Sequence, residues 1–209
     1  MKADELLDLA PVVPVVVLDD PDAAVPLARA LVAGGLPVIE VTLRTATALE
    51  SIERIASEVP DAVVGAGTVV HPEDARRSAA AGARFLVSPG CTPGLLDAMT
   101  ASGVPFLPGV SSASEAMALL EHGVTAMKFF PAGPAGGPDH LKALGGPLPR
   151  IRFCPTGGVT QDNAPRYLAL PNVACVGGTW LTPSDAVRDG DWPRIEALAA
   201  KAAALRGAP

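Results

Sequence analysis

Cysteine, aromatic residues and long apolar runs are scarce in this sequence of 209 residues. Its three cysteines, Cys91, Cys154 and Cys175, lie far apart, which predicts neither a disulfide framework nor a zinc site. No apolar run reaches the ~18 residues that span a membrane. The N-terminus, Met1-Lys2-Ala3-Asp4-Glu5, lacks the basic start and apolar block of a signal peptide. We therefore expect a cytoplasmic protein without a membrane partner.

Positive charge is also in short supply, because 16 lysine and arginine residues face 22 aspartate and glutamate residues, for a formal net charge of −6. This balance argues against nucleic acid as a partner, since a phosphate backbone requires a basic surface. A small anionic substrate is still possible, because backbone N–H groups at a helix start can bind phosphate. Only four of the basic residues are lysines, so a lysine in an apolar segment is conspicuous.

Short apolar runs alternate with helical patterns along the whole chain. The expected strands are Val12–Leu18, Val38–Leu43, Ala62–Gly65, Arg84–Val87, Val104–Leu107, Thr125–Phe129, Ile151–Cys154 and Val173–Val176. A short lead-in helix over Met1–Leu9 precedes them, and a helical pattern follows each. Repeated strand–helix units predict parallel strands, and eight units close into a (β/α)8 TIM barrel. We expect a single α/β domain over residues 1–209, with reactive side chains at the C-terminal ends of the strands.

Two segments match the capping box that opens many helices. They are Thr47-Ala-Leu-Glu50 and Ser112-Ala-Ser-Glu115, and each first residue is expected to cap its own helix. The first strand is not followed by a Gly-x-Gly-x-x-Gly pattern, so a dinucleotide-binding fold is disfavoured.

Lys128 closes the sixth expected strand, in Thr-Ala-Met-Lys-Phe-Phe-Pro. A lysine at a strand end can simply hold its ammonium group in water. Here the flanks are Met127, Phe129 and Phe130, and desolvation favours the neutral amine. A neutral amine can attack a carbonyl carbon to form a Schiff base. Lys128 is therefore a candidate nucleophile.

Glu40 lies inside the second expected strand, in Val-Ile-Glu-Val-Thr-Leu-Arg. A carboxylate in a fully covered parallel sheet is unusual, and its plain interpretation is a structural ion pair. Alternation along the strand places Glu40, Thr42 and Arg44 on one side, which we expect to face the barrel axis. Glu40 is a candidate proton shuttle, and Arg44 is a candidate fork for a substrate carboxylate.

Glycine-rich turns follow several expected strands. Gly157-Gly158 follows the seventh strand, and Gly177-Gly178-Thr179 follows the eighth, which is the frequent phosphate site of such barrels. After the third strand, in Gly65-Ala-Gly-Thr68, the glycines would let a substrate approach the backbone, and the Thr68 hydroxyl could bind an anionic oxygen. Each turn taken alone is a weak signal, but two glycine pairs after neighbouring strands favour a phosphate site.

The remaining candidates carry weaker signals. Pro89 and Phe130 stand at strand ends and can form apolar walls of a site or simply pack. The histidines show no metal-ligand spacing, so no metal is expected. Cys154 and Cys175 lie in strand patterns and are expected to be core residues.

The chain resembles the bacterial 2-keto-3-deoxy-6-phosphogluconate (KDPG) aldolases, which often also act as 4-hydroxy-2-oxoglutarate (KHG) aldolases. The resemblance runs from about residue 11 to 182. It is carried by the segments PVVPVVVLDD, LVAGGLPVIEVTLRT, VVGAGTVVHPE, FLVSPG, PFLPGVSSASE, MKFFPAG, IRFCPTGGVT and VACVGGTWL. It implies a class I aldolase without metal or cofactor, usually a homotrimer. Such an enzyme cleaves KDPG, a small anionic 2-keto sugar-acid phosphate, to pyruvate and D-glyceraldehyde 3-phosphate in the Entner–Doudoroff route.

The resemblance also implies a role for each matching residue. Lys128 would form the Schiff base and Glu40 would be the general acid and base. The substrate-binding residues would be Arg44 and Thr68 for the carboxylate, Pro89 and Phe130 for the pyruvyl group, and Gly157, Gly158, Gly178 and Thr179 for the phosphate.

Three alternatives stay open from the residues alone. One is an aldolase of the galactonate series that uses the same lysine but differs in stereochemistry at C4. Another is a sugar-phosphate isomerase or epimerase, which needs a second acid or base beside Glu40. The third is a phosphosugar-binding barrel without catalysis, which would bury an inward lysine and glutamate at a high energetic cost.

Overall fold

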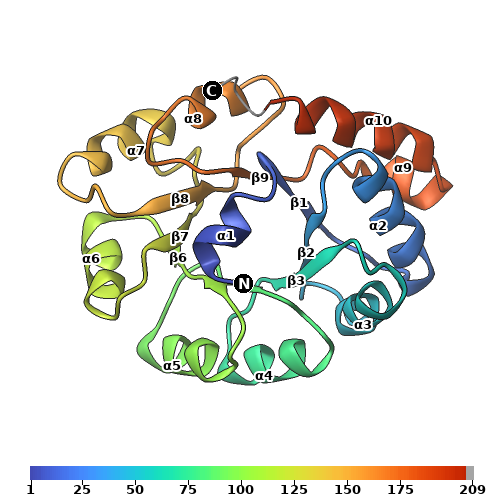
Figure 1. Cartoon of the computed structure of the whole chain (residues 1–209), viewed down its shortest axis with the longest axis horizontal. Coiled ribbons are helices and arrows are strands. Elements are labelled where there is room, and N and C mark those ends of the chain that lie inside the picture. The colour runs from blue at the N-terminus through green and yellow to red at the C-terminus, as the bar shows by residue number, and fades with distance from the viewer. Residues whose placement is uncertain (206–209) are drawn as a thin grey trace.

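The computed structural model describes residues 1–205, in which short strands alternate with helices (Figure 1). The strands are β1 Val12–Val16, β2 Val38–Thr42, β3 Val63–Gly67, β4 Leu86–Val87, β5 Phe106–Leu107, β6 Gly109–Val110, β7 Ala126–Phe129, β8 Arg152–Pro155 and β9 Val176–Gly178. The helices are α1 Ala3–Leu7, α2 Ala24–Ala33, α3 Ala48–Glu58, α4 Pro72–Ala80, α5 Pro93–Ala101, α6 Ala113–Glu121, α7 Gly137–Gly145, α8 Ala164–Leu168, α9 Ser184–Asp189 and α10 Trp192–Ala203, with the 3-10 helix η1 Pro21–Ala23 ahead of α2. The last four residues of the expected domain lie outside the described range.

All strand pairs are parallel, as the alternation predicts. One sheet has the order β5-β4-β3-β2-β1-β9, and the other has the order β6-β7-β8. Two isolated bridges connect the region of β8 with the region of β9. They join Phe153 to Val173, which precedes β9, and Thr156, which follows β8, to Gly177. The parallel α/β fold is confirmed. Closure of all strands into one complete barrel stays a prediction.

The fifth expected strand, Val104–Leu107, is shortened to its last two residues in the structure, and an unexpected strand, β6, follows it. Pro108 separates β5 from β6 and has no N–H to donate to a sheet. Its carbonyl still accepts the Lys128 N–H at 3.0 Å, so β7 is held across the interruption. The described residues therefore form nine strands rather than the eight expected.

Strand side chains alternate between two apolar clusters. One cluster lies between strands and helices, and Figure 1 shows those helices around the outside of the strands. The second cluster, which we call the inner core, lies on the opposite side of the strands. It consists of Leu6, Leu7, Val13, Val38, Val63, Phe85, Val87, Leu107, Ala126, Cys154 and Cys175. Because a strand alternates faces, Lys128 shares the inner side with Ala126, and Glu40 shares it with Val38.

Helix α1 covers the N-terminal end of the inner core. In Figure 1 it lies across the centre of the strands, inside the ring of helices. Leu6 and Leu7 are 2% and 1% exposed and belong to the inner core. Arg152 of β8 anchors the helix, because its guanidinium binds Asp8 at 2.6 Å and also contacts Asp4. The expected lead-in helix is thus present, and the opposite end of the strands, which we call the mouth, is left for a site.

The two capping boxes have different outcomes. At α6, Glu115 accepts hydrogen bonds from the backbone N–H groups of Ser111 and Ser112, as predicted. At α3, the predicted box is wrong, because the Thr47 hydroxyl makes no cap bond. Among residues 1–205 no helix has the length and apolarity needed to cross a bilayer.

We expect Glu115→Gln to destabilise the protein by about 0.5 kcal/mol at neutral pH, because glutamine still fits the capping box but loses the charge at the helix N-terminus. The backbone N–H of Ser111 is the largest cause that lowers the pKa of Glu115, and the hydroxyls of Ser112 and Ser111 add to it. A lowered pKa means that the stabilisation is complete above the unfolded-state pKa. It disappears as the pH falls through the folded-state pKa.

Urea unfolding at neutral and acidic pH measures this difference. Glu121→Gln, at the other end of α6, is the control and should lose no stability, because a carboxylate there opposes the helix dipole. A Glu115→Gln effect that is the same at both pH values would contradict the carboxylate cap.

Candidate active site

A buried ion pair between Lys128 and Glu40 lies at the centre of the candidate site. The Lys128 Nζ and the Glu40 Oε1 are 3.2 Å apart, and the two residues are 5% and 3% exposed. Lys128 comes from β7 and Glu40 from β2, 88 residues apart. Removing each charge from water costs several kcal/mol, so each needs the other. The structure therefore brings together the two residues that the sequence singled out for chemistry.

Two further residues shape this pair. The Lys128 Nζ lies 5.3 Å from the centroid of the Phe130 ring, within cation–π range. Gly67 of β3 makes room for the Glu40 carboxylate, because a Cβ at that position would overlap Glu40 Oε1. The sequence predicted that this glycine would let a substrate approach the backbone. In the structure its missing side chain is the space that Glu40 occupies.

Arg44 lies two residues beyond the end of β2, in the turn that follows the strand. Strand β2 ends at Thr42, so the alternation does not reach Arg44, which is exposed in the following turn. The turn is joined to β3, because the Leu43 N–H donates to the Gly67 carbonyl at 2.9 Å. The residue after Gly67 is Thr68, and it has a φ of 59°. Arg44 and Thr68 therefore follow two residues that are hydrogen-bonded to each other.

The φ angle of Thr68 is notable because it is positive. Among residues 1–205, Thr68 is the only residue other than glycine with such an angle. A positive φ costs a β-branched side chain roughly 1–3 kcal/mol. Such strain gathers at functional sites, which favours the prediction that Thr68 takes part in binding.

The two glycine corners lie next to each other. Gly157 and Gly158 have φ angles of 91° and 81°, which a residue with a Cβ rarely adopts. The bridge between Thr156 and Gly177 puts this turn beside the end of β9, where Gly178 is buried and Thr179 is exposed. The glycine turns after the seventh and eighth expected strands are therefore neighbours in the structure.

A cavity of about 540 Å³ lies beside Thr179, between the loop after β1 and α9, and neither Lys128 nor Glu40 is among the residues that line it. Thr179 lines this cavity, and so does Val15 of β1. Val15 is the register partner of Glu40. Phe130 packs against the other corner, since a Cβ on Gly157 would lie 3.1 Å from its ring. Pro89 is half-buried just after β4, and a Cβ on Gly109 would overlap its carbonyl group.

Thr156 is a residue that the sequence analysis missed. It follows β8 two residues after the inner-core Cys154, so it faces the same side as Lys128. Its hydroxyl is buried and has no hydrogen-bond partner among the described residues. Such a group costs roughly 1–3 kcal/mol and is expected to meet a ligand. In the sequence, Thr156 is a polar residue two positions after Cys154, so strand alternation places it on the inward side near the C-terminal end of the strand.

Two of the three cysteines are core residues, as expected. Cys154 and Cys175 are buried in the inner core, where hydrogen bonding to Cys154 and burial raise the pKa of Cys175. Burial also raises the pKa of Cys91 to about 11. At neutral pH Cys91 and Cys175 are therefore thiols rather than thiolates. Among the described residues, no group of three or more histidine, cysteine, aspartate and glutamate side chains is placed to hold a metal ion.

Comparisons with known proteins show the family of this chain. A family model for KDPG and KHG aldolases matches residues 3–198. A 2-dehydro-3-deoxy-phosphogluconate aldolase of Pseudoalteromonas atlantica is 52% identical over 204 residues, which cover 98% of this chain and 95% of the relative. This chain belongs to the KDPG and KHG aldolase family.

Two other family members give the same result. The KHG/KDPG aldolase of Escherichia coli K12 is 50% identical over 201 residues, which cover 96% of this chain and 94% of the relative. A crystal structure of the KDPG aldolase of Legionella pneumophila has a TM-score of 0.95 and 45% identity, over 97% of this chain and 98% of that one. In that structure pyruvate was captured at low pH as a covalent carbinolamine intermediate.

We expect Gly67→Ala to reduce aldolase kcat/KM by about 100-fold, since a displacement of ~1 Å in a catalytic group has effects of that size. The new methyl group would push the Glu40 carboxylate away from Lys128. Gly94→Ala on α5 is the matched control, because a Cβ there meets nothing within 4 Å. Steady-state kinetics of both variants, with circular dichroism to check folding, measures the effect. Full activity in folded Gly67→Ala would contradict it.

We expect Thr156→Val to stabilise the folded protein by about 1 kcal/mol, because it removes a buried hydroxyl that lacks a protein partner. The same change should reduce kcat/KM by about tenfold through the loss of one hydrogen bond to substrate. Thr156→Ser keeps the hydroxyl and should retain activity. Urea unfolding and kinetics test both parts, and a Val variant with wild-type kcat/KM would remove Thr156 from the site.

Proposed function

We propose that this protein is a class I aldolase that cleaves KDPG to pyruvate and D-glyceraldehyde 3-phosphate. The observation that carries the proposal is the buried Lys128–Glu40 pair on the inner side of the strands. A Schiff-base aldolase needs an amine beside a group that moves protons, and this pair supplies both. Family membership supports the same reaction.

The reaction begins at the C2 ketone of the substrate. Proton transfer from Lys128 to Glu40 gives the neutral amine, which attacks C2, and Glu40 then transfers protons, directly or through a water, while the carbinolamine loses water and becomes an iminium ion. The iminium draws the electrons of the C3–C4 bond as that bond breaks, and Glu40 accepts the proton of the C4 hydroxyl. The resulting enamine is protonated at C3 and hydrolysed, which releases pyruvate and restores the amine.

The substrate would lie across the mouth from Lys128 to the glycine corners. We assign its carboxylate to Arg44 and Thr68, because the residues before them are hydrogen-bonded to each other. We assign the pyruvyl group to the apolar walls of Phe130 and Pro89. We assign the phosphate to the two glycine corners, specifically Gly157, Gly158, Gly178 and Thr179.

We also propose the wider setting of the enzyme. The two parallel sheets and their bridges support one (β/α)8 barrel domain, and the family resemblance implies a homotrimer in the cytoplasm. Cleavage of KHG to pyruvate and glyoxylate is a second activity, favoured by the 50% identity to the KHG/KDPG aldolase of Escherichia coli.

Borohydride trapping tests the proposed chemistry. Incubation with pyruvate and borohydride, followed by intact-mass spectrometry and peptide mapping, should show a reduced pyruvyl adduct on Lys128. We expect Lys128→Met to form no adduct and to lose turnover, because no other amine replaces it. Lys142→Met, which changes a lysine on α7, should be trapped like the wild type.

The outcomes separate the candidate functions. An adduct on Lys128 together with KDPG cleavage supports the aldolase, and measurement with the galactonate-series substrate decides the preference at C4. The absence of an adduct, under conditions that trap a known class I aldolase, would overturn the Schiff-base mechanism. Sugar-phosphate isomerase activity or ligand binding by Lys128→Met would then favour the isomerase or the non-catalytic sensor.

A further inference from the structure

We infer that Thr45 and Thr47 are positioning residues that hold the turn carrying Arg44 and so set the affinity for the substrate carboxylate. This inference rests on the proposed function, in which Arg44 binds that carboxylate. It concerns two threonines to which neither the resemblance nor the site geometry above assigns a role.

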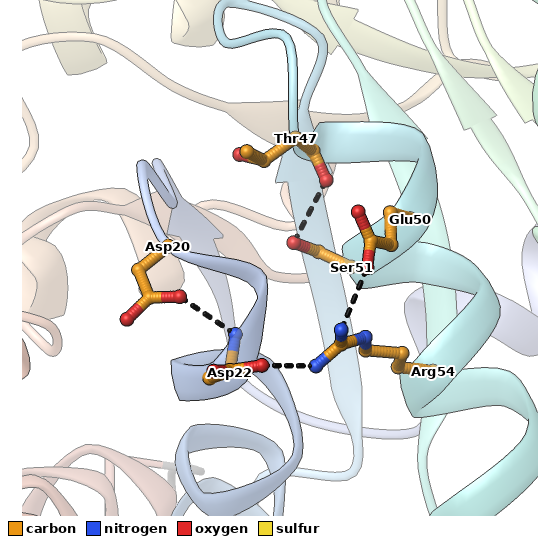
Figure 2. Close-up of polar contacts among 6 residues, drawn as sticks. All are labelled: Asp20, Asp22, Thr47, Glu50, Ser51 and Arg54. Atoms are coloured by element: carbon orange, nitrogen blue, oxygen red, sulfur yellow. Dashed lines mark hydrogen bonds and ion pairs between the residues drawn. The ribbon is translucent and has the colours of Figure 1, made fainter.

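The first observation is that Thr47 does not cap its own helix. It stands at the N-cap of α3, where a threonine hydroxyl normally accepts a backbone N–H bond. Instead its hydroxyl donates to the carbonyl of Leu18, two residues after the end of β1, at 2.7 Å. Glu50, the other member of the predicted box, binds Arg54 (Figure 2). A local preference has therefore been replaced by a contact between residues 29 positions apart, which is expected at functional sites.

The second observation is that Thr45 binds the same acceptor. Its hydroxyl donates to the Leu18 carbonyl at 2.6 Å. A carbonyl oxygen has two lone pairs, so it can accept both hydroxyls. Because each hydroxyl has one proton, the 3.1 Å contact between the two threonine oxygens adds no further hydrogen bond. Together the three residues form a clamp, which we define as Thr45, Thr47 and Leu18.

The clamp fixes one side of the turn, and β3 fixes the other. Arg44 lies between Leu43, whose N–H binds Gly67, and Thr45, whose hydroxyl binds Leu18. The turn is therefore held between the ends of β1 and β3. An exposed arginine has many rotamers, and a fixed backbone reduces the conformational freedom that must be lost when a carboxylate binds.

A second link between the segments that follow β1 and β2 is weaker. Figure 2 shows Arg54 of α3 between Glu50 and Asp22, the latter in η1. The Arg54 and Asp22 side chains are 35% and 79% exposed, and such surface pairs contribute little. The half-buried hydroxyl bonds to Leu18, which is 1% exposed, are thus the main constraint on the turn.

The test compares a ketone with a carboxylate and a ketone without one. Borohydride trapping of Lys128 is measured against the concentration of pyruvate and, separately, of acetone. We expect Thr45→Val/Thr47→Val to raise the half-saturating pyruvate concentration by about tenfold, while that for acetone changes by less than about twofold. The single variants should each show part of the effect, and they are measured in case the double variant does not fold.

Two controls complete the experiment. Thr45→Ser keeps the hydroxyl, so it should show the wild-type pyruvate dependence that Thr45→Val loses. Thr100→Val removes a hydroxyl that donates to a carbonyl within α5 and should leave both ketones unaffected. Thermal unfolding of every variant reports stability separately.

The inference and the proposed function fail in different ways. Wild-type pyruvate dependence in the folded double variant would overturn the inference alone, and so would equal losses for pyruvate and acetone, which indicate a merely structural role. If Arg44→Ala itself keeps the wild-type pyruvate dependence, the assignment of Arg44 is wrong and the inference falls with it. If the wild type forms no adduct on Lys128, the proposed chemistry fails first.

Discussion

The buried pair of Lys128 and Glu40 is the constraint on which the rest of the site depends. Neither charge is stable alone among apolar strands, so the two must meet at short range even though they come from distant parts of the chain. That requirement explains why β3 has a glycine at residue 67, since any larger side chain would occupy the place of the carboxylate. It also makes the centre chemically versatile, because an amine and a proton acceptor are already in contact.

The apolar surroundings of the pair come from the way the N-terminal end of the strands is closed. Helix α1 contributes Leu6 and Leu7 to the inner core, and Arg152 ties it to β8. On the inner side, Val38, Val63 and Ala126 lie below the pair and are apolar, whereas Thr42, Gly67 and Thr156 follow on the same side towards the mouth. The inner side of the strands thus changes from packing to binding along their length, as expected for a fold whose sites lie at C-terminal strand ends.

At the mouth, loops hold one another through backbone carbonyls. Leu18 accepts two threonine hydroxyls from the turn after β2, and Gly157 accepts the N–H of Gly133, in the loop after β7, at 2.8 Å. These bonds are short and directional, and they join segments that regular secondary structure leaves free. Such bonds can fix backbone positions on turns as well as on strands, which the proposed carboxylate and phosphate sites require.

The sequence alone determined the alternation of strands and helices, the lysine and glutamate of the pair, and the glycine corners. These follow from local periodicity, from residue types that are costly to bury, and from motifs with a fixed order. The partners were decided by the tertiary structure. Thr47 bonds to Leu18 instead of its own helix, Gly67 makes room for Glu40, and Thr156 is left with an unpaired buried hydroxyl. Each of these depends on what a neighbouring strand or loop presents at contact distance, and local sequence patterns do not encode that information.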